Sequence, residues 1–480
     1  MSRRIVGPFN RVEGDLEIAL EIGDGRVQSA QVNSPLYRGF EQILLGKAPL
    51  DALVFVPRIC GICSVAQSAA SAQALAQAAG IEPPPNGRIA ANLMLATENL
   101  ADHLTHFYLY FMPDFARAEY AQQPWFAGAE ARFKAMRGAA AAEMLPARAG
   151  FMRVMGLIAG KWPHTLALQP GGSSRPLQAS EKIRLRLILR EFRGFLEQAL
   201  FGDALENVAA LASVDQLAAW GAAHAASDLG RFLAIARELS LQQLGRAGDL
   251  FMSYGSFPQE AGRLFAAGIW DGAPAPLDLG AIREDVRHAW YAEADAPQAP
   301  AAGATLPLAE KAGAYSWCKA PRYAGRVAEV GALARQLVAG HPLARALAVE
   351  GGGNVLSRVV MRVVEIARVL PEMERWVEQL APGEPYCVAA DLPDDADGVG
   401  LVEAARGSLG HWLSVRRGRI HNYQIIAPTT WNFSPRDAQQ MPGALEQALV
   451  GVPAGEGGAT PAAVQHVVRS FDPCMVCTVH

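Results

Sequence analysis

Two short segments, RICGIC (residues 58–63) and DPCMVC (residues 472–477), stand at opposite ends of this 480-residue chain. Each holds two cysteines at a spacing that lets both thiolates reach one soft metal ion. The second segment is followed only by Thr478, Val479 and His480. Chain ends usually fray, so we expect this tail to be buried and held in place. Each segment therefore predicts two thiolates within reach of one soft metal centre, and the second also predicts a buried tail.

The composition is that of a globular protein with a large core, because 51% of residues are hydrophobic and 19% are charged. The net charge of −4 gives no reason to expect nucleic acid as a partner. No apolar run reaches the roughly 18–20 residues that span a bilayer, and the N-terminus lacks an apolar signal segment. Six cysteines are too few for a disulfide framework in so long a chain. We expect a cytoplasmic protein without a membrane span.

Local patterns predict mostly helix. Residues 16–22 alternate between apolar and polar side chains, a Gly-Asp-Gly turn follows, and residues 27–32 complete a β-hairpin. The alanine-rich residues 64–79 predict a helix that ends at Gly80. The first cysteine pair lies at the N-terminus of this helix, where the helix dipole favours thiolate over thiol.

The rest of the chain supports an α+β, predominantly α fold, with a large helical-bundle core and small β elements. Residues 88–112 form a long apolar segment. Further helices are expected at residues 180–200, 206–246 and 326–380, and loops at residues 292–310 and 453–463. We interpret the chain as one unit, with the hairpin and first cysteine pair in residues 1–80, the helical core in 81–400 and a metal-binding segment in 401–480.

Three kinds of site would explain the two cysteine pairs. A structural zinc site is one, but zinc pairs usually lie close together in the sequence. A dithiol redox motif is another, but the second pair at the tail does not suit a strand-to-helix turn. The third is a catalytic transition-metal site closed by the two ends of the chain.

The segments around both cysteine pairs closely resemble the ligand motifs of nickel-iron hydrogenase large subunits. Further segments resemble motifs of the same family, in the same order along the chain: RVEG (11–14), YRGFE (37–41), GKWPH (160–164) with PGG (170–172), ARGSLGHW (405–412) and PTTWN (428–432). The resemblance therefore spans nearly the whole chain. It implies the large-subunit fold and the reversible, heterolytic cleavage of dihydrogen to protons and electrons.

The resemblance implies that all four cysteines bind nickel as thiolates. Cys63 and Cys477 would also bridge to an iron that carries carbonyl and cyanide ligands, while Cys60 and Cys474 would bind only the nickel. Glu13 would take a proton from Cys474 and pass it outward, a role that suits a carboxylate whose pKa burial can tune. Without its motif, Glu13 would be read as an ordinary salt-bridge partner.

The resemblance also implies a set of residues around the open side of the metals. Arg406 would lie over the metals and donate to a cyanide, as its fixed guanidinium fork allows. Thr429 would bind the other cyanide, and Asp114 and Asp472 would hold the Arg406 side of the pocket in place. Taken singly, each of these residues could equally be a surface group.

A second metal ion, magnesium, is implied near the tail. Its ligands would be Glu41, the backbone carbonyl of Ile425, and His480; oxygen ligands suit magnesium, whereas histidine is unusual for it. Cys318 and Cys387 match no ligand motif, and we expect both to be small buried apolar side chains.

Two bulky residues indicate the type of hydrogenase. Ile62 and Tyr110 stand where energy-converting members usually carry Val and Leu, on the narrow gas path to the metals. Bulky residues at these two positions mark hydrogen-sensing members, although those members usually have Phe at the second position. Two further residues depart from the family pattern: Asp15 replaces the usual His, and Ala405 replaces the usual Pro. The chain therefore looks most like a regulatory, hydrogen-sensing large subunit; the alternative for Ile62 and Tyr110 is conservative variation in the core.

The expected partners follow from the resemblance. An iron-sulfur small subunit would accept the electrons, since this chain has no spare cysteine set for a cluster. A dimer of these heterodimers would signal to a histidine kinase. The alternatives are an energy-conserving uptake hydrogenase and a non-catalytic scaffold like the related subunit of respiratory complex I.

His103 and His106, which share a helix face, are expected to be packing residues.

Overall fold

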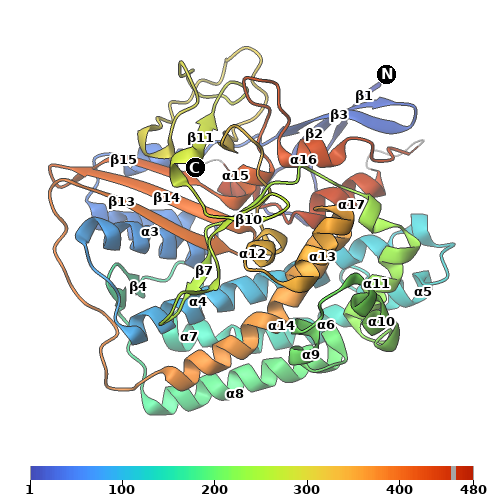
Figure 1. The fold of residues 1–480 in the computed structure, drawn as a ribbon, viewed down its shortest axis with the longest axis horizontal. Coiled ribbons are helices and arrows are strands. Elements are labelled where there is room, and N and C mark those ends of the chain that lie inside the picture. The colour runs from blue at the N-terminus through green and yellow to red at the C-terminus, as the bar shows by residue number, and fades with distance from the viewer. Residues whose placement is uncertain (1, 456–460, 479–480) are drawn as a thin grey trace.

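The computed structural model describes residues 2–455 and 461–478 and confirms a predominantly helical chain with small sheets (Figure 1). The helices are α1 Phe40–Leu44, α2 Ala52–Phe55, α3 Ser64–Ala79, α4 Pro85–Thr105, α5 Phe126–Phe133, α6 Ala139–Phe151, α7 Arg153–Ala159, α8 Ala179–Phe195, α9 Leu205–Ala209, α10 Val214–Ala223, α11 Asp228–Glu238, α12 Ala332–Val338, α13 Pro342–Gly351, α14 Val355–Gln379, α15 Pro428–Asn432, α16 Ala444–Leu449 and α17 Ala462–Ser470.

The strands form several small antiparallel sheets. They are β1 Ser2–Val6, β2 Glu17–Gly23, β3 Arg26–Asn33, β4 Leu168–Gln169, β5 Gly172–Ser173, β6 Phe251–Ser253, β7 Ser256–Pro258, β8 Arg263–Phe265, β9 Gly268–Trp270, β10 Pro274–Ala275, β11 Ile282–Asp285, β12 Ala320–Tyr323, β13 Ala396–Ala404, β14 Gly407–Arg416 and β15 Arg419–Ile426. The predicted hairpin is present as β2 and β3, with β1 as a third strand on β2. The short strands between residues 251 and 323 were not expected from the sequence.

Long helices form the lower layer in Figure 1, where α8, α14 and α4 lie one above another. Helix α14 begins at Asn354, whose side chain accepts a 2.9 Å hydrogen bond from the backbone N–H of Ser357. Most of its residues are buried, and two of its buried charged side chains form ion pairs in the core: Arg358 with Glu329 and Glu365 with Arg335. These pairs let a helix with several charges pass through the core.

Helix α3 packs against the three-stranded sheet β13–β14–β15, mainly along β13 (Figure 1). Glycines allow this close contact. A Cβ at Gly398 would lie 2.0 Å from the carbonyl oxygen of Ala74, and one at Gly400 would lie 1.8 Å from that of Ala70. Gln73 of α3 accepts a 2.7 Å hydrogen bond from the N–H of Leu401. The outer edge of β13 is thus covered by the helix that carries the first cysteine pair.

The predicted end of α3 is confirmed. Gly80 has a φ of 64° and its N–H returns to the carbonyls of Ala76 and Gln77, so the left-handed residue that ends the helix is a glycine. One large hydrophobic cluster draws residues from the N-terminal hairpin, the long helices and the C-terminal segment. The division into residues 1–80, 81–400 and 401–480 stays a prediction. Across residues 2–455 and 461–478, we find no helix with the length and apolar character that crossing a bilayer requires.

Candidate metal centre

The two ends of the chain meet at a buried cluster of Cys60, Cys63, Cys474 and Cys477, whose sulfur atoms all lie within 4.8 Å of one another. The Sγ–Sγ distances are 3.4 Å from Cys60 to Cys474, 3.2 Å from Cys63 to Cys477 and 2.9 Å from Cys474 to Cys477. All four are free thiols. A set of four soft donors at one point fits a thiolate-bound transition metal, so the donor chemistry suits nickel.

The local backbone sets the direction in which the side chains of both cysteine pairs point. Cys63 is the residue at which α3 begins, whereas Cys477 closes a 3₁₀ turn over Met475–Cys477. Arg38, from the YRGFE segment, donates to the carbonyls of Arg58, at 2.9 Å, and of Ile59. Its guanidinium therefore holds the loop just before Cys60.

Glu13 lies beside the second pair because the two backbones are joined there. The N–H of Met475 donates to the carbonyl of Glu13 at 2.7 Å, and the N–H of Glu13 donates to the carbonyl of Pro473 at 3.3 Å. The next residue, Gly14, has a φ of 80°, and a Cβ there would lie 2.9 Å from the backbone nitrogen of Val476. Only glycine permits this approach.

The Glu13 carboxyl is half-buried, and the charges of Cys60 and Arg406 act on it. Burial raises its pKa above the ordinary value, the charge of Cys60 raises it further, and Arg406 opposes both effects. A carboxyl with a raised pKa can bind and release a proton nearer to neutral pH than an exposed glutamate can.

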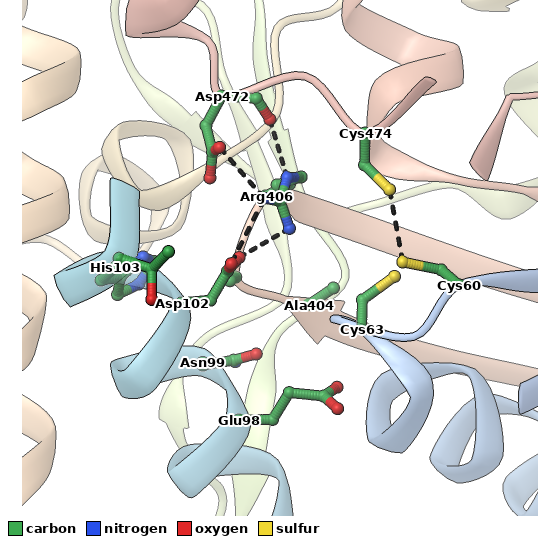
Figure 2. Close-up of polar contacts among 12 residues, drawn as sticks. Cys60, Cys63, Glu98, Asn99, Asp102, His103, Ala404, Arg406, Asp472 and Cys474 are labelled. Atoms are coloured by element: carbon green, nitrogen blue, oxygen red, sulfur yellow. Dashed lines mark hydrogen bonds and ion pairs between the residues drawn. The ribbon is translucent and has the colours of Figure 1, made fainter. Parts of the chain in front are cut away.

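Arg406 is buried and held between two carboxylates (Figure 2). Its Nη1 donates to Asp102 at 2.6 Å, while Nη2 donates to Asp472 Oδ1 at 3.0 Å and Nε to the Asp472 carbonyl at 2.8 Å. Burial raises the pKa of Asp102 to about 7 although Arg406 opposes this. Burial would also raise the pKa of Asp472, but the combined attraction of Arg406, His106 and Arg362 lowers it. Both acids raise the pKa of Arg406, which stays a cation.

Asp114 pairs with Arg11 and Arg469 and not with Arg406, so its role on the Arg406 side of the pocket stays a prediction. The second carboxylate on Arg406 comes instead from Asp102, which the sequence analysis missed. Its signal was present in the sequence: Glu98 and Asp102 are acids four residues apart, hence on one face of a largely buried helix. Asp472 contacts Arg406 through both its side chain and its backbone carbonyl, and its role in the pocket stays a prediction.

Asp114 anchors the two ends of the chain to the core. It pairs with Arg11, just before Glu13, and with Arg469 of α17, whose Nη1 lies 2.6 Å from Oδ2. Burial alone would raise the pKa of Asp114, but its contacts with His466 and the two arginines hold it well below its usual value. The carboxylate therefore stays ionised at neutral pH.

Replacing Asp114 with alanine is expected to lower the free energy of unfolding by about 3–5 kcal/mol, because Arg11 and Arg469 would lose a buried partner. Chemical denaturation measures this loss. Glu119→Gln is the matched control, since this exposed acid pairs only at 3.4 Å with Arg117 and its removal should cost about 0–1 kcal/mol. Equal losses for the two variants would show that Asp114 is not an anchor.

Thr429 lies at the start of α15 and touches the second cysteine pair. Its hydroxyl oxygen accepts a 3.0 Å hydrogen bond from the backbone N–H of Cys474. The hydroxyl proton remains able to donate, so a bond from Thr429 to a ligand on the metal stays a prediction.

Around the predicted magnesium site, Glu41 is buried next to a lysine that the sequence analysis did not single out. Glu41 accepts a 2.8 Å hydrogen bond from the N–H of Ile425 and lies 3.2 Å from the Nζ of Lys319, which also pairs with Glu284. The third predicted ligand, His480, lies outside the described residues. The magnesium site therefore stays a prediction.

The gas-path role of Ile62 and Tyr110 stays a prediction. Ile62 is half-buried within the Cys60–Cys63 turn. Tyr110 is half-buried, and its carbonyl accepts a 3.0 Å hydrogen bond from Arg11. Burial, and after it the charge of Asp102, raises the pKa of Tyr110 to about 12, so the phenol is neutral and close to the carboxylates of the pocket.

The remaining candidates lie outside the cluster. His103 contacts Glu365 at 3.1 Å and His106 contacts the carbonyl of Arg469 at 2.6 Å; both are buried packing residues. Cys318 is buried as expected, but Cys387 is exposed, which corrects the prediction for that residue. Its backbone pairs with Gly172 of β5.

Comparisons with known proteins agree with this site. The sequence matches the family described as nickel-dependent hydrogenase over residues 38–124 and 128–480. It is 30% identical to the periplasmic NiFeSe hydrogenase large subunit of Desulfomicrobium baculatum, over 99% of this chain and 94% of that protein. It is 29% identical to the Hydrogenase-2 large chain of Escherichia coli K12, over 100% of this chain and 97% of that one. The reduced Ni-Fe-Se hydrogenase from D. vulgaris Hildenborough superposes with a TM-score of 0.84 at 30% identity, with 100% of both chains covered.

Proposed function

Because the chain belongs to the nickel-dependent hydrogenase family, as a large subunit, we propose that it cleaves dihydrogen at a nickel-iron centre and acts as a hydrogen sensor. The observation that carries the catalytic part is the single cluster formed by Cys60, Cys63, Cys474 and Cys477. A scaffold without catalysis would need none of these four thiols. The bound metals, with iron carrying carbonyl and cyanide, would supply the site at which dihydrogen is polarised.

The chain's own residues then handle the proton and the charge. Cys474 would be the base, because a thiolate can accept a proton next to the metal. Glu13, joined to the Cys474 segment through its backbone, would accept that proton and pass it outward. Arg406, kept cationic between Asp102 and Asp472, would stabilise negative charge above the metals.

Two further features of the proposal concern partners and ions. We propose that magnesium binds at Glu41, the Ile425 carbonyl and His480. We also propose an iron-sulfur small subunit as the electron partner. Exposed apolar side chains precede the first cysteine pair, as a docking surface would require; they are Leu36, Ile43, Leu45, Leu50 and Val54. A dimer of heterodimers in the cytoplasm, in contact with a histidine kinase, completes the proposal.

The sensor role rests on Ile62 and Tyr110. Both side chains are larger than the Val and Leu expected in energy-converting members, and both lie beside the metal pocket. A narrower path would admit dihydrogen more readily than dioxygen. Slow turnover that persists in air is the expected behaviour of such a sensor.

Infrared spectroscopy and dye reduction on the complete heterodimer test both parts of the proposal. Bands of carbonyl and cyanide on iron, with hydrogen-dependent dye reduction, are expected; zinc in place of nickel and no such bands would overturn the catalytic part. Activity should survive oxygen in the natural protein and be lost faster in the Ile62→Val, Tyr110→Leu double variant. Rapid inactivation of the natural protein in air would favour an energy-conserving uptake hydrogenase instead.

A further inference from the structure

Glu98 is a fully buried carboxyl group that none of the roles above uses, and it faces the start of α3 (Figure 2). One oxygen, Oε2, accepts from the N–H of Val65 at 2.9 Å, from Trp162 Nε1 at 2.9 Å and from the Ser64 hydroxyl at 3.3 Å. The other, Oε1, accepts from the N–H of Ala66 at 2.9 Å. Both oxygens are therefore engaged by the first turn of α3.

The first turn of a helix has N–H groups without partners inside the helix, and the residue before it usually supplies a side-chain oxygen. Here that residue is Cys63, whose side chain makes no capping hydrogen bond. Its sulfur belongs to the four-cysteine cluster instead. Glu98 reaches across from α4 and performs the capping that Cys63 does not.

The same contacts join a third segment to the cysteine turn. The Ser64 hydroxyl accepts a 3.2 Å hydrogen bond from the N–H of His164, and His164 Nδ1 lies 2.9 Å from the carbonyl of Pro57. Trp162 and His164 both belong to the GKWPH segment. Glu98 thus ties α4 to this segment and to both sides of the Cys60–Cys63 turn.

One turn further along α4, Asp102 binds Arg406. A single helix therefore carries one carboxyl that holds the turn of the first cysteine pair and another that holds the arginine above the pocket. Burial raises the pKa of Glu98 to about 8 against the lowering effect of the Val65 and Ala66 N–H groups. The contacts need only acceptor oxygens, which both protonation states of the carboxyl provide.

We propose that Glu98 is a positioning residue that fixes the direction of the Cys63 sulfur by capping α3 from α4. The proposal rests on the metal site of the proposed function and adds a residue to it. A group that orients a metal ligand in this way typically changes metal affinity or activity by about 10–100-fold when it is replaced.

Glu98→Gln in the complete heterodimer tests this. The glutamine amide keeps the shape of the carboxyl group but has only one acceptor oxygen. The donors that contact the other carboxyl oxygen of Glu98 therefore lose their acceptor. We expect lower nickel occupancy, hydrogen oxidation reduced about 10–100-fold, and displaced carbonyl and cyanide bands of the iron. Band position is the decisive measurement, because a purely structural role in the core would not move it.

Glu446→Gln is the matched control. Glu446 is also a buried carboxyl that caps a helix, α16, and its hydrogen bonds are to the N–H of Val32, at 3.0 Å, to Tyr315 and to Gly443. Its variant should lose stability but keep the band positions. Unchanged bands and nickel content in Glu98→Gln would overturn the inference. Absence of iron bands in the natural protein would instead overturn the proposed function. If Glu98→Gln folds but takes up no metal while Glu446→Gln loads normally, the inference stands.

Discussion

Replacing Cys474 with serine is expected to abolish hydrogen oxidation and to reduce bound nickel to background. The Cys474 sulfur lies 3.4 Å from Cys60 and 2.9 Å from Cys477, so it is an integral member of the cluster. Serine offers a hard, protonated oxygen where a soft thiolate is needed. The change also removes the proposed base, and positioned bases alone contribute about 10²–10⁴-fold to a rate.

Metal analysis and hydrogen-dependent dye reduction measure the two losses separately. Cys387→Ser is the matched control, because Cys387 is a free, exposed cysteine outside the cluster. This control should keep both nickel and activity. Retention of full nickel content and activity by Cys474→Ser would show that the four thiols do not form the catalytic site.

The features that were predictable from the sequence are local ones. The Cys-x-x-Cys spacing, the alanine-rich α3 and its glycine end each depend on residues a few positions apart. That these local features belong at one site came from the resemblance of many ordered segments to one family. The fold class followed from the same two sources.

The features that the sequence did not reveal depend on tertiary contacts. Asp102 and Asp114 are both acids in or just after the same long helix, and only the packed structure shows that Asp102 faces Arg406 while Asp114 faces Arg11 and Arg469. Glu98 gave no motif because two of its four partners are backbone N–H groups, which every residue but proline carries, and the other two belong to residues 34 and 64 positions away. The short strands at residues 251–323 pair with one another, and each has only two to four residues, too few for an alternating pattern to mark it in the sequence.

Replacing Glu13 with glutamine is expected to leave the metals in place and to reduce hydrogen oxidation by about 10²–10⁴-fold, since an amide cannot carry the proton. The backbone bonds between Glu13 and the Cys474 segment do not involve the side chain, so metal loading should be normal. Nickel content and infrared bands check this, and Glu17→Gln on β2, whose carboxylate contacts Asn33 at 3.2 Å, is the control.

The pH profile separates loss of a proton relay from a general disturbance of the pocket. The pKa of Glu13 is raised by burial and by Cys60, so the natural enzyme should lose activity as the pH falls through that raised pKa, where the carboxylate becomes protonated and can no longer accept a proton. The Glu13→Gln variant should lack this acidic limb and keep a low, flat rate. A variant with the natural profile and rate would remove Glu13 from the proton path and leave Cys474 to release its proton by another route.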